Sequence, residues 1–199
     1  MLTSINSMPF IRESIITTLH DDGSAHIAPM GVHETERGLM LAPFKPSATL
    51  HNLLRDKTAT INYPDDVRIF AGCLTGRRDW QTHPTDVIAG IRLSDCLAHT
   101  EVNVHTHEDD ELRPRFYCQV VHEQMHRPFH GYNRAQFAVI ELAILVSRLH
   151  MLSTDKIDSE IEYLRIGLDK TAGNKELEAW SWLMEAVTEF KNKPIEKQQ

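Results

Sequence analysis

The chain has 199 residues, of which 41% are hydrophobic and 25% are charged, a composition typical of a globular protein that is long enough to bury a core. Its formal net charge is −7, and no stripe of Lys and Arg offsets the 28 acidic residues, so we expect no nucleic-acid partner. No apolar run approaches the length of a bilayer span, so we expect no membrane partner either.

The first 130 residues are predicted to form mainly β-strands. β-Branched residues and the Asp-Asp-Gly turn after residue 20 indicate a first hairpin. The predicted elements, in chain order, are strands at 10–20, 24–34 and 38–44, a short helix at 47–56, a strand at 57–63, an extended piece at 66–74, a polar loop at 76–86, and a long hairpin of 91–107 with 115–121. These elements predict a strand-rich module over residues 1–130.

After Tyr132 the hydrophobic period changes to that of amphipathic helices. Apolar residues at 135, 138, 139, 142, 145, 146 and 149 predict one helix. A second helix begins near Ser153 and ends at Gly173, and a third covers 177–190. We therefore expect a helical module over 131–192 and a frayed polar tail at 193–199, which together with the strands make an α+β protein.

The cysteines and the N-terminus bear on the compartment. Cys73, Cys96 and Cys118 are odd in number and widely spaced, which argues against a disulfide framework. The first residues lack the pattern of a signal peptide. A cytoplasmic location is the expectation.

The stretch His122-Glu-Gln-Met-His126 matches the zinc-protease signature H-E-x-x-H. That signature works inside a helix, where both histidines face one metal ion and Glu123 would polarise its water. Here a strand-like run precedes it, and Pro128 would disrupt a helix. We therefore predict a strand that leads into a loop and no metal ligands, and we keep a zinc-dependent hydrolase as a further alternative.

Three longer stretches carry a family resemblance. They are SIITTLHDDGSAHIAPMGV (14–32), LAPFKPSATLHNLLRDKTATINYPDD (41–66) and GYNRAQFAVIELAILVSRL (131–149). In this order and spacing, the chain resembles the FMN-binding, flavin-reductase-like split barrels of domain-of-unknown-function family 447, over nearly its whole length. The resemblance implies a six-stranded antiparallel split barrel that binds FMN at a homodimer interface, followed by a helical appendage.

The FMN phosphate is expected at the start of the short helix. Lys45 supplies a positive charge, Ser47 and Thr49 supply hydroxyls, and helix N–H groups favour an anion. Phe44 and Asn52 complete this segment. Ordinary N-capping by Ser47 is the structural alternative.

The flavin ring is expected against Ala28, Pro29, Met30 and Gly31. Small residues let the backbone approach a flat ligand, and Pro29 inside a strand indicates an edge or a bulge. An irregular edge strand without a ligand is the alternative.

Three further residues are candidate flavin contacts. Asn62 and Asp65 close the strand before Pro64, where Asn62 is equally a turn residue. Arg134 is expected to contact the phosphate or to pair with a carboxylate.

The leading functional hypothesis is an FMN-dependent oxidoreductase that acts on a small molecule, in which the cofactor carries out the chemistry. The chain has no G-x-G-x-x-G, so NAD(P)H would bind only transiently. The family association suggests a pterin-linked substrate of one-carbon metabolism. A non-catalytic FMN carrier or sensor dimer is the alternative.

Overall fold

The computed structural model describes residues 10–193. Residues 1–9 and 194–199 lie outside this range. The expectations of no signal peptide at the first residues and of a frayed tail at 193–199 therefore concern mostly residues outside it. The chain divides into two compact units, one of residues 1–63 with 81–127 and the other of residues 64–80 with 128–199. Residues 64–80 thus group with the helices, whereas the sequence prediction assigned all of 1–130 to the strand-rich module.

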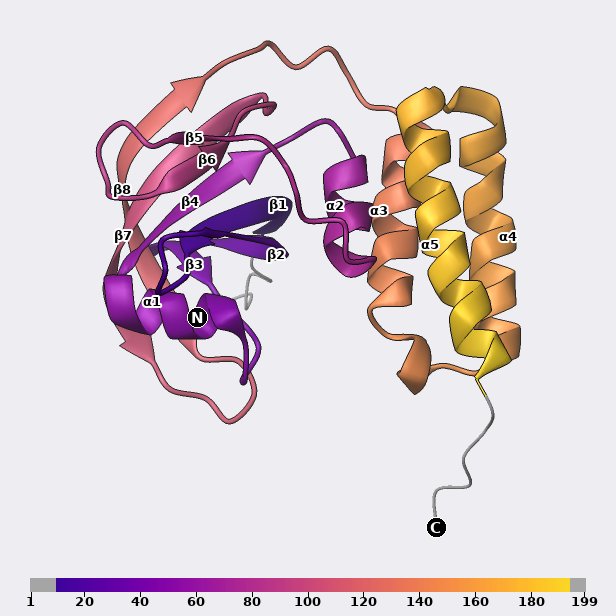
Figure 1. The fold of residues 1–199 in the computed structure, drawn as a ribbon, viewed down its shortest axis with the longest axis horizontal. Coiled ribbons are helices and arrows are strands. Elements are labelled where there is room, and N and C mark those ends of the chain that lie inside the picture. The colour runs from indigo at the N-terminus through magenta and orange to yellow at the C-terminus, as the bar shows by residue number, and fades with distance from the viewer. Residues whose placement is uncertain (1–9, 194–199) are drawn as a thin grey trace, which may run out of the picture. The chain divides into compact units, whose positions relative to one another are not determined.

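The first unit is a closed antiparallel barrel in the order β1-β2-β3-β8-β7-β4 (Figure 1). The strands are β1 (Phe10–Leu19), β2 (Ala25–Thr35), β3 (Gly38–Leu41), β4 (Thr58–Tyr63), β7 (Ala98–Glu108) and β8 (Arg115–Met125). Helix α1 (Ala48–Asp56) places Leu50 and Leu53 in the barrel core beside Ile16, Ile61 and Phe116. The strands and the short helix that the sequence predicts in this unit are confirmed, with ends that differ by a few residues.

Strand β2 is the irregular part of the barrel. It pairs with β1 along its whole length, but its recorded pairs with β3 involve only residues 33–35. Pro29 lies in the segment without a recorded partner on that side, where its missing N–H removes no ladder bond. The sequence indicated an edge or a bulge at Pro29, and the structure has an edge there.

The chain between β4 and β7 also forms a small second sheet. It consists of β5 (Thr82–Pro84) and β6 (Ile91–Leu93), joined by the loop 85–90. The carbonyl of Ile91 accepts a hydrogen bond of 2.6 Å from Thr17 Oγ1, which fastens β6 to β1. The polar loop predicted at 76–86 therefore contains one short strand that polarity alone did not indicate.

The second unit is helical, with α2 (Arg68–Leu74), α3 (Arg134–Val146), the 3-10 turn η1 (Leu149–Met151), α4 (Thr154–Thr171) and α5 (Asn174–Asn192). The three helices predicted after residue 132 are confirmed, and the side chain of Asn133 caps α3. Their apolar faces share one core that includes Leu142, Ile157 and Leu183.

The expectation of an extended piece at 66–74 was wrong, because this segment forms α2. Short apolar runs fit a strand or a buried helix equally well. Here Val67 and Ala71 pack into the helical core, and the Asp66 carboxylate accepts the N–H of Arg68 at the start of the helix. None of the helices in residues 10–193 is long and apolar enough to cross a membrane.

Candidate functional site

The N-terminus of α1 is the exposed end of the predicted phosphate segment. Ser47 caps the helix, since its Oγ accepts the N–H of Leu50 at 3.2 Å. Lys45 Nζ lies 3.2 Å from Asp109 Oδ1 in an exposed ion pair, and the Lys45 N–H donates to the Leu112 carbonyl. The segment before α1 is therefore tied to the tip of the β7–β8 hairpin, with the Lys45 ammonium accessible to solvent.

Thr49 and Asn52, two other residues of this segment, point inward. Thr49 Oγ1 lies 2.9 Å from the imidazole of His26 on β2, and Asn52 Nδ2 donates to Thr18 on β1 at 2.9 Å. Both side chains are at most 3% exposed. Their polar groups hold α1 against the barrel, whereas Phe44, at 63% exposed, projects into solvent beneath the guanidinium of Arg113.

Residues 28–31 of β2 lie next to this helix in the fold, because His26, the partner of Thr49, is only two residues before Ala28. All four are partly exposed. The carbonyl of Met30 accepts a hydrogen bond from the buried Ser14 at 2.8 Å. A Cβ on Gly31 would lie 2.7 Å from Ile11 Cγ2, so the structure requires glycine there for packing against β1.

Asn62 lies at a fully buried position, and its amide groups have protein partners. Its Nδ2 donates to the Ile15 carbonyl and to Thr17 Oγ1, and its Oδ1 accepts the Leu93 N–H at 2.7 Å. This arrangement joins β4, β1 and β6. Asn62 is thus a structural crosslink whose hydrogen-bonding groups face protein.

Asp65 and Arg134 belong to the helical unit. The Asp65 carbonyl accepts a hydrogen bond from Gln136 Nε2 at 3.0 Å, and Arg134 is an exposed residue at the start of α3. Arg134 also lines a hollow between α3 and α4, beside Tyr163 and Gly167. The structure thus brings the barrel candidates around α1 and β2 together and assigns these two residues to the other unit.

An open hollow of about 620 Å³ lies on the barrel unit at a different place. Arg37 is its cationic residue, and its guanidinium stacks 3.5 Å above the Tyr117 ring while bonding Glu108. The lining residues are Glu34, Thr35, Arg37, Gly38, Leu39, His105, Cys118, Gln119 and Val120. None of these was predicted as a site residue, because they come from four separate strands, β2, β3, β7 and β8, whose pairing the sequence does not specify.

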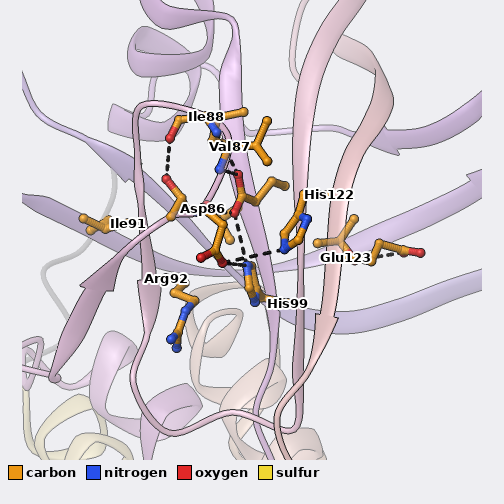
Figure 2. Close-up of polar contacts among 12 residues, drawn as sticks. Asp86, Val87, Ile88, Ile91, Arg92, His99, His122 and Glu123 are labelled. Atoms are coloured by element: carbon orange, nitrogen blue, oxygen red, sulfur yellow. Dashed lines mark hydrogen bonds and ion pairs between the residues drawn. The ribbon is translucent and has the colours of Figure 1, made fainter.

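The motif around His122 lies in strand β8 up to Met125, which confirms the expected strand context. Neighbouring side chains of a strand point to opposite faces. Accordingly, Glu123 turns away from His122 in Figure 2 and accepts a hydrogen bond of 3.2 Å from Thr100. The geometry of a zinc protease, in which the glutamate serves the ion held by the two histidines, is absent from this segment.

His122 instead belongs to a cluster that the sequence analysis missed. We define the His99 cluster as Asp86, His99, Glu101 and His122, whose ligand-type atoms all lie within 4.8 Å of one another. His99 and Glu101 are fully buried on one face of β7, and His122 pairs with Glu101 across the ladder. The sequence does show that His99 and Glu101, two residues apart, would share one face of a strand. It does not show that the loop 85–90 brings Asp86 to them.

The carboxylate of Glu101 is held by that loop. Burial by itself would raise the pKa of Glu101, but hydrogen bonds from the backbone N–H groups of Ile88, Asp86 and Val87 outweigh it, and the pKa is lowered. Glu101 is therefore an anion inside the protein, 3.3 Å from His99 Nε2.

The comparisons with solved structures show the fold. An FMN-bound protein from Methanosarcina mazei superposes with a TM-score of 0.76 at 18% identity, over 94% of this chain and 100% of that chain. A flavoredoxin from Methanosarcina acetivorans gives 0.52 at 13% identity over 62% and 75%, and the flavin reductase PheA2 gives 0.50 at 14% identity over 58% and 80%. The barrel is therefore a flavin-reductase-like split barrel, as the resemblance implied.

The sequence comparisons identify the family. No curated protein sequence matches the chain. The model described as "Protein of unknown function (DUF447) N-terminal domain" matches residues 12–127, and that described as "Protein of unknown function (DUF447)" matches residues 133–185. Together they cover both units, and the chain belongs to the DUF447 family.

Proposed function

We propose that this protein binds FMN and is an FMN-dependent oxidoreductase acting on a small molecule. The observation that carries the proposal is the likeness, over 94% of the chain, to a protein of the same family that is FMN-bound in its crystal structure. FMN, when bound, supplies the hydride or electron-transfer chemistry, and the protein supplies binding and orientation.

The residues at the start of α1 fit a phosphate. Lys45 offers an accessible ammonium, and the first N–H groups of a helix have no partner within it. Ser47 takes the N–H of Leu50, which leaves those of Ala48 and Thr49 pointing out of the helix end. A phosphate dianion is favoured there by the charge of Lys45 and by the helix dipole.

The edge of β2 fits the polar rim of the flavin ring. Residues 28–31 are paired with β1 on one side and have no recorded pair with β3, and backbone groups that point to the other side of such a strand are available to a ligand. The buried pairs of Thr49 with His26 and of Asn52 with Thr18 fix α1 against this strand. In this proposal the two buried pairs are positioning contacts that set the distance between the phosphate site and the ring site.

We also propose a homodimer with FMN at the interface. Phe44 and Leu112 are 63% and 69% exposed beside the proposed phosphate site, and exposed apolar side chains next to a binding site are typical of an interface. Sedimentation that shows a flavin-loaded species of 22.8 kDa, the mass of one chain, would contradict this assembly.

For the location we propose the cytoplasm. None of the three cysteines, all buried in the described part of the chain, forms a disulfide, which is usual for a reducing compartment.

The first experiment identifies the cofactor. Protein reconstituted with a mixture of FMN and FAD and then denatured is expected to release FMN. The barrel offers a compact phosphate site and the sequence has no Rossmann fingerprint for an adenine nucleotide. Release of FAD, or of no flavin, would overturn the proposal.

The second experiment tests turnover. FMN-loaded protein is mixed anaerobically with NADH, NADPH or reduced pterins, and bleaching of the flavin absorbance is followed. We expect bleaching by one of these donors, with reduced pterins tested because of the one-carbon association. An unbleached flavin with all three would reject the oxidoreductase and leave an FMN carrier or sensor.

A further inference from the structure

We propose that the His99 cluster is a binding site for one divalent transition-metal ion, with Zn²⁺ as the best-matched ion. The four ligands are Asp86 Oδ2, His99 Nε2, Glu101 Oε1 and His122 Nε2. This site lies in the barrel unit and is separate from the proposed FMN site.

The distances between the ligand atoms suit a four-coordinate ion. Zinc bonds to nitrogen and oxygen are about 2.0–2.2 Å long, which separates the ligand atoms of a tetrahedral site by roughly 3.4 Å. His99 Nε2 lies 3.3 Å from Glu101 Oε1 and 3.7 Å from Asp86 Oδ2, and His122 Nε2 lies 3.6 Å from Asp86 Oδ2. All pairs of ligand atoms lie within 4.8 Å, so binding of the ion requires only a small contraction of the cluster.

His99 has the environment of an oriented metal ligand. Its Nδ1 lies 2.9 Å from His126 Nε2, and the two rings stack at 5.0 Å between centroids. When the Nδ1–H of His99 donates to His126, the Nε2 lone pair points at the carboxylates, as metal-bound histidines require.

Glu101 has one position left for a cation. Its Oε2 accepts the N–H groups of Val87 and Ile88, and its Oε1 accepts that of Asp86. The remaining lone pair of Oε1 faces His99 Nε2. The carboxylate is therefore fixed before any ion binds, so little ordering entropy opposes coordination.

The buried Nε2 of His122 favours a metal ion over a shared proton as the occupant of the cluster. A proton shared by His99 and Glu101 would satisfy those two groups, but it would leave His122 Nε2 buried without a hydrogen-bond partner, as the structure shows it. An ion bound by the cluster gives that nitrogen a partner. A dication also balances the two carboxylates, and the guanidinium of Arg92 points away from the ligand atoms in Figure 2.

The proposed site is structural. With four protein ligands the ion has no open position for substrate or for reactive water. It would fasten the loop 85–90 to β7 and β8, at the end of these strands opposite the Glu108–Arg115 hairpin tip. His99 and Glu108 are nine positions apart on β7, about 30 Å of extended strand, which separates the metal site from the proposed phosphate site at Lys45.

The test uses full-length protein without an affinity tag, stripped with a chelator and dialysed. Calorimetric titration with Zn²⁺ is expected to show one ion per chain, and saturating Zn²⁺ should raise the melting temperature. In His122→Gln and Asp86→Asn, affinity should fall at least tenfold. The matched control is His105→Gln, an exposed histidine of the same β7 that lies outside the cluster, which should bind Zn²⁺ like the wild type.

Circular dichroism of the metal-free variants checks that they are folded. We expect normal folding because the side chains of His122 and Asp86 are at least partly exposed. Absence of Zn²⁺ binding by the wild type overturns the proposal, and so does wild-type affinity in both ligand variants. Equal loss in His105→Gln would identify adventitious surface binding and would overturn it too. Flavin release from stripped protein is recorded in parallel and reports only on the proposed function.

Discussion

The imidazole of His26 and the hydroxyl of Thr49 form a buried hydrogen bond of 2.9 Å that ties β2 to α1. Thr49 is therefore engaged by protein, although its place at the start of a helix suggested a phosphate ligand. Lys45, four residues earlier, is accessible. The proposed phosphate site thus combines one accessible cation with a helix end that buried contacts hold in position.

Lys45→Ala should weaken FMN binding much more than riboflavin binding, because riboflavin lacks the phosphate. Loss of one charge-assisted hydrogen bond costs about 1.5–3 kcal/mol, which corresponds to a roughly ten- to hundredfold loss of affinity. Fluorescence titration of both flavins measures the difference. Lys170→Ala, at an exposed position of α4, is the control; an equal loss for both flavins in Lys45→Ala would reject the phosphate contact.

Thr49→Val should lower the free energy of unfolding by about 1–3 kcal/mol, because the buried imidazole of His26 loses its hydroxyl partner. Chemical denaturation measures this change. If Thr49 acts mainly by positioning α1, the affinities for FMN and riboflavin should change by the same factor. A loss confined to FMN would instead support a direct phosphate contact by Thr49.

His122→Ala and His126→Ala should leave the affinity for FMN nearly unchanged. His122 and Arg115, which lies at the hairpin tip near Lys45, are seven positions apart, a distance of about 23 Å along β8. Flavin titration at a temperature well below unfolding tests this. If these variants lost all activity while the Lys45 and Thr49 variants bound FMN normally, the flavin hypothesis would be wrong and the histidine motif would be the functional feature.

Gly38→Ala should destabilise the barrel more than Gly23→Ala does. Both glycines have positive φ, 102° and 79°, but a Cβ on Gly38 would lie 2.9 Å from the Cys118 carbonyl oxygen, whereas that on Gly23 meets nothing within 4 Å. The left-handed conformation alone costs about 1–2 kcal/mol in each variant. Thermal unfolding compares them, and equal losses would show that β3 shifts away from β8 without cost.

Asp66→Asn should destabilise the helical unit at neutral pH. Burial raises the pKa of Asp66, but hydrogen bonds from Arg68 and Lys175 outweigh it, and the pKa is lowered. A lowered pKa contributes stability that is present above the unfolded value of about 3.9 and is lost as the pH falls through the folded value. We expect a difference of about 1.5–3 kcal/mol from the wild type above roughly pH 5, shrinking below roughly pH 4.

Urea unfolding at several pH values measures this difference. The control is Asp169→Asn on the exposed face of α4. A pH-independent difference between wild type and Asp66→Asn would contradict an ionised Asp66 as its cause.

Local patterns in the sequence were enough to predict most of the elements. The 3.6-residue spacing of Leu142 and its neighbours specifies α3, because a helix needs one continuous apolar face and little else. Pro29 indicated an edge or a bulge because a residue without an N–H cannot donate a hydrogen bond to a neighbouring strand. The family could be inferred for the same reason, since it shows in three contiguous stretches of chain.

Long-range packing decided the rest. Residues 68–74 are helical because Val67 and Ala71 fill a core built by helices more than sixty residues later in the sequence. Thr49 faces His26 because of the way α1 is rotated about its own axis against β2. Helix propensity does not specify that rotation.

The sequence by itself determined the two-part organisation into strands and helices, the family, and the strand context of the His122 motif, because each depends on neighbouring residues. Only the tertiary structure decided what His122 faces. Its partners in the His99 cluster come from β7 and from the loop 85–90, and they meet because the ladder opposes Glu101 to His122 while three backbone N–H groups of the loop bind the Glu101 carboxylate. Strand register and loop closure are set by contacts between distant segments, so no local spacing of residues could have revealed them.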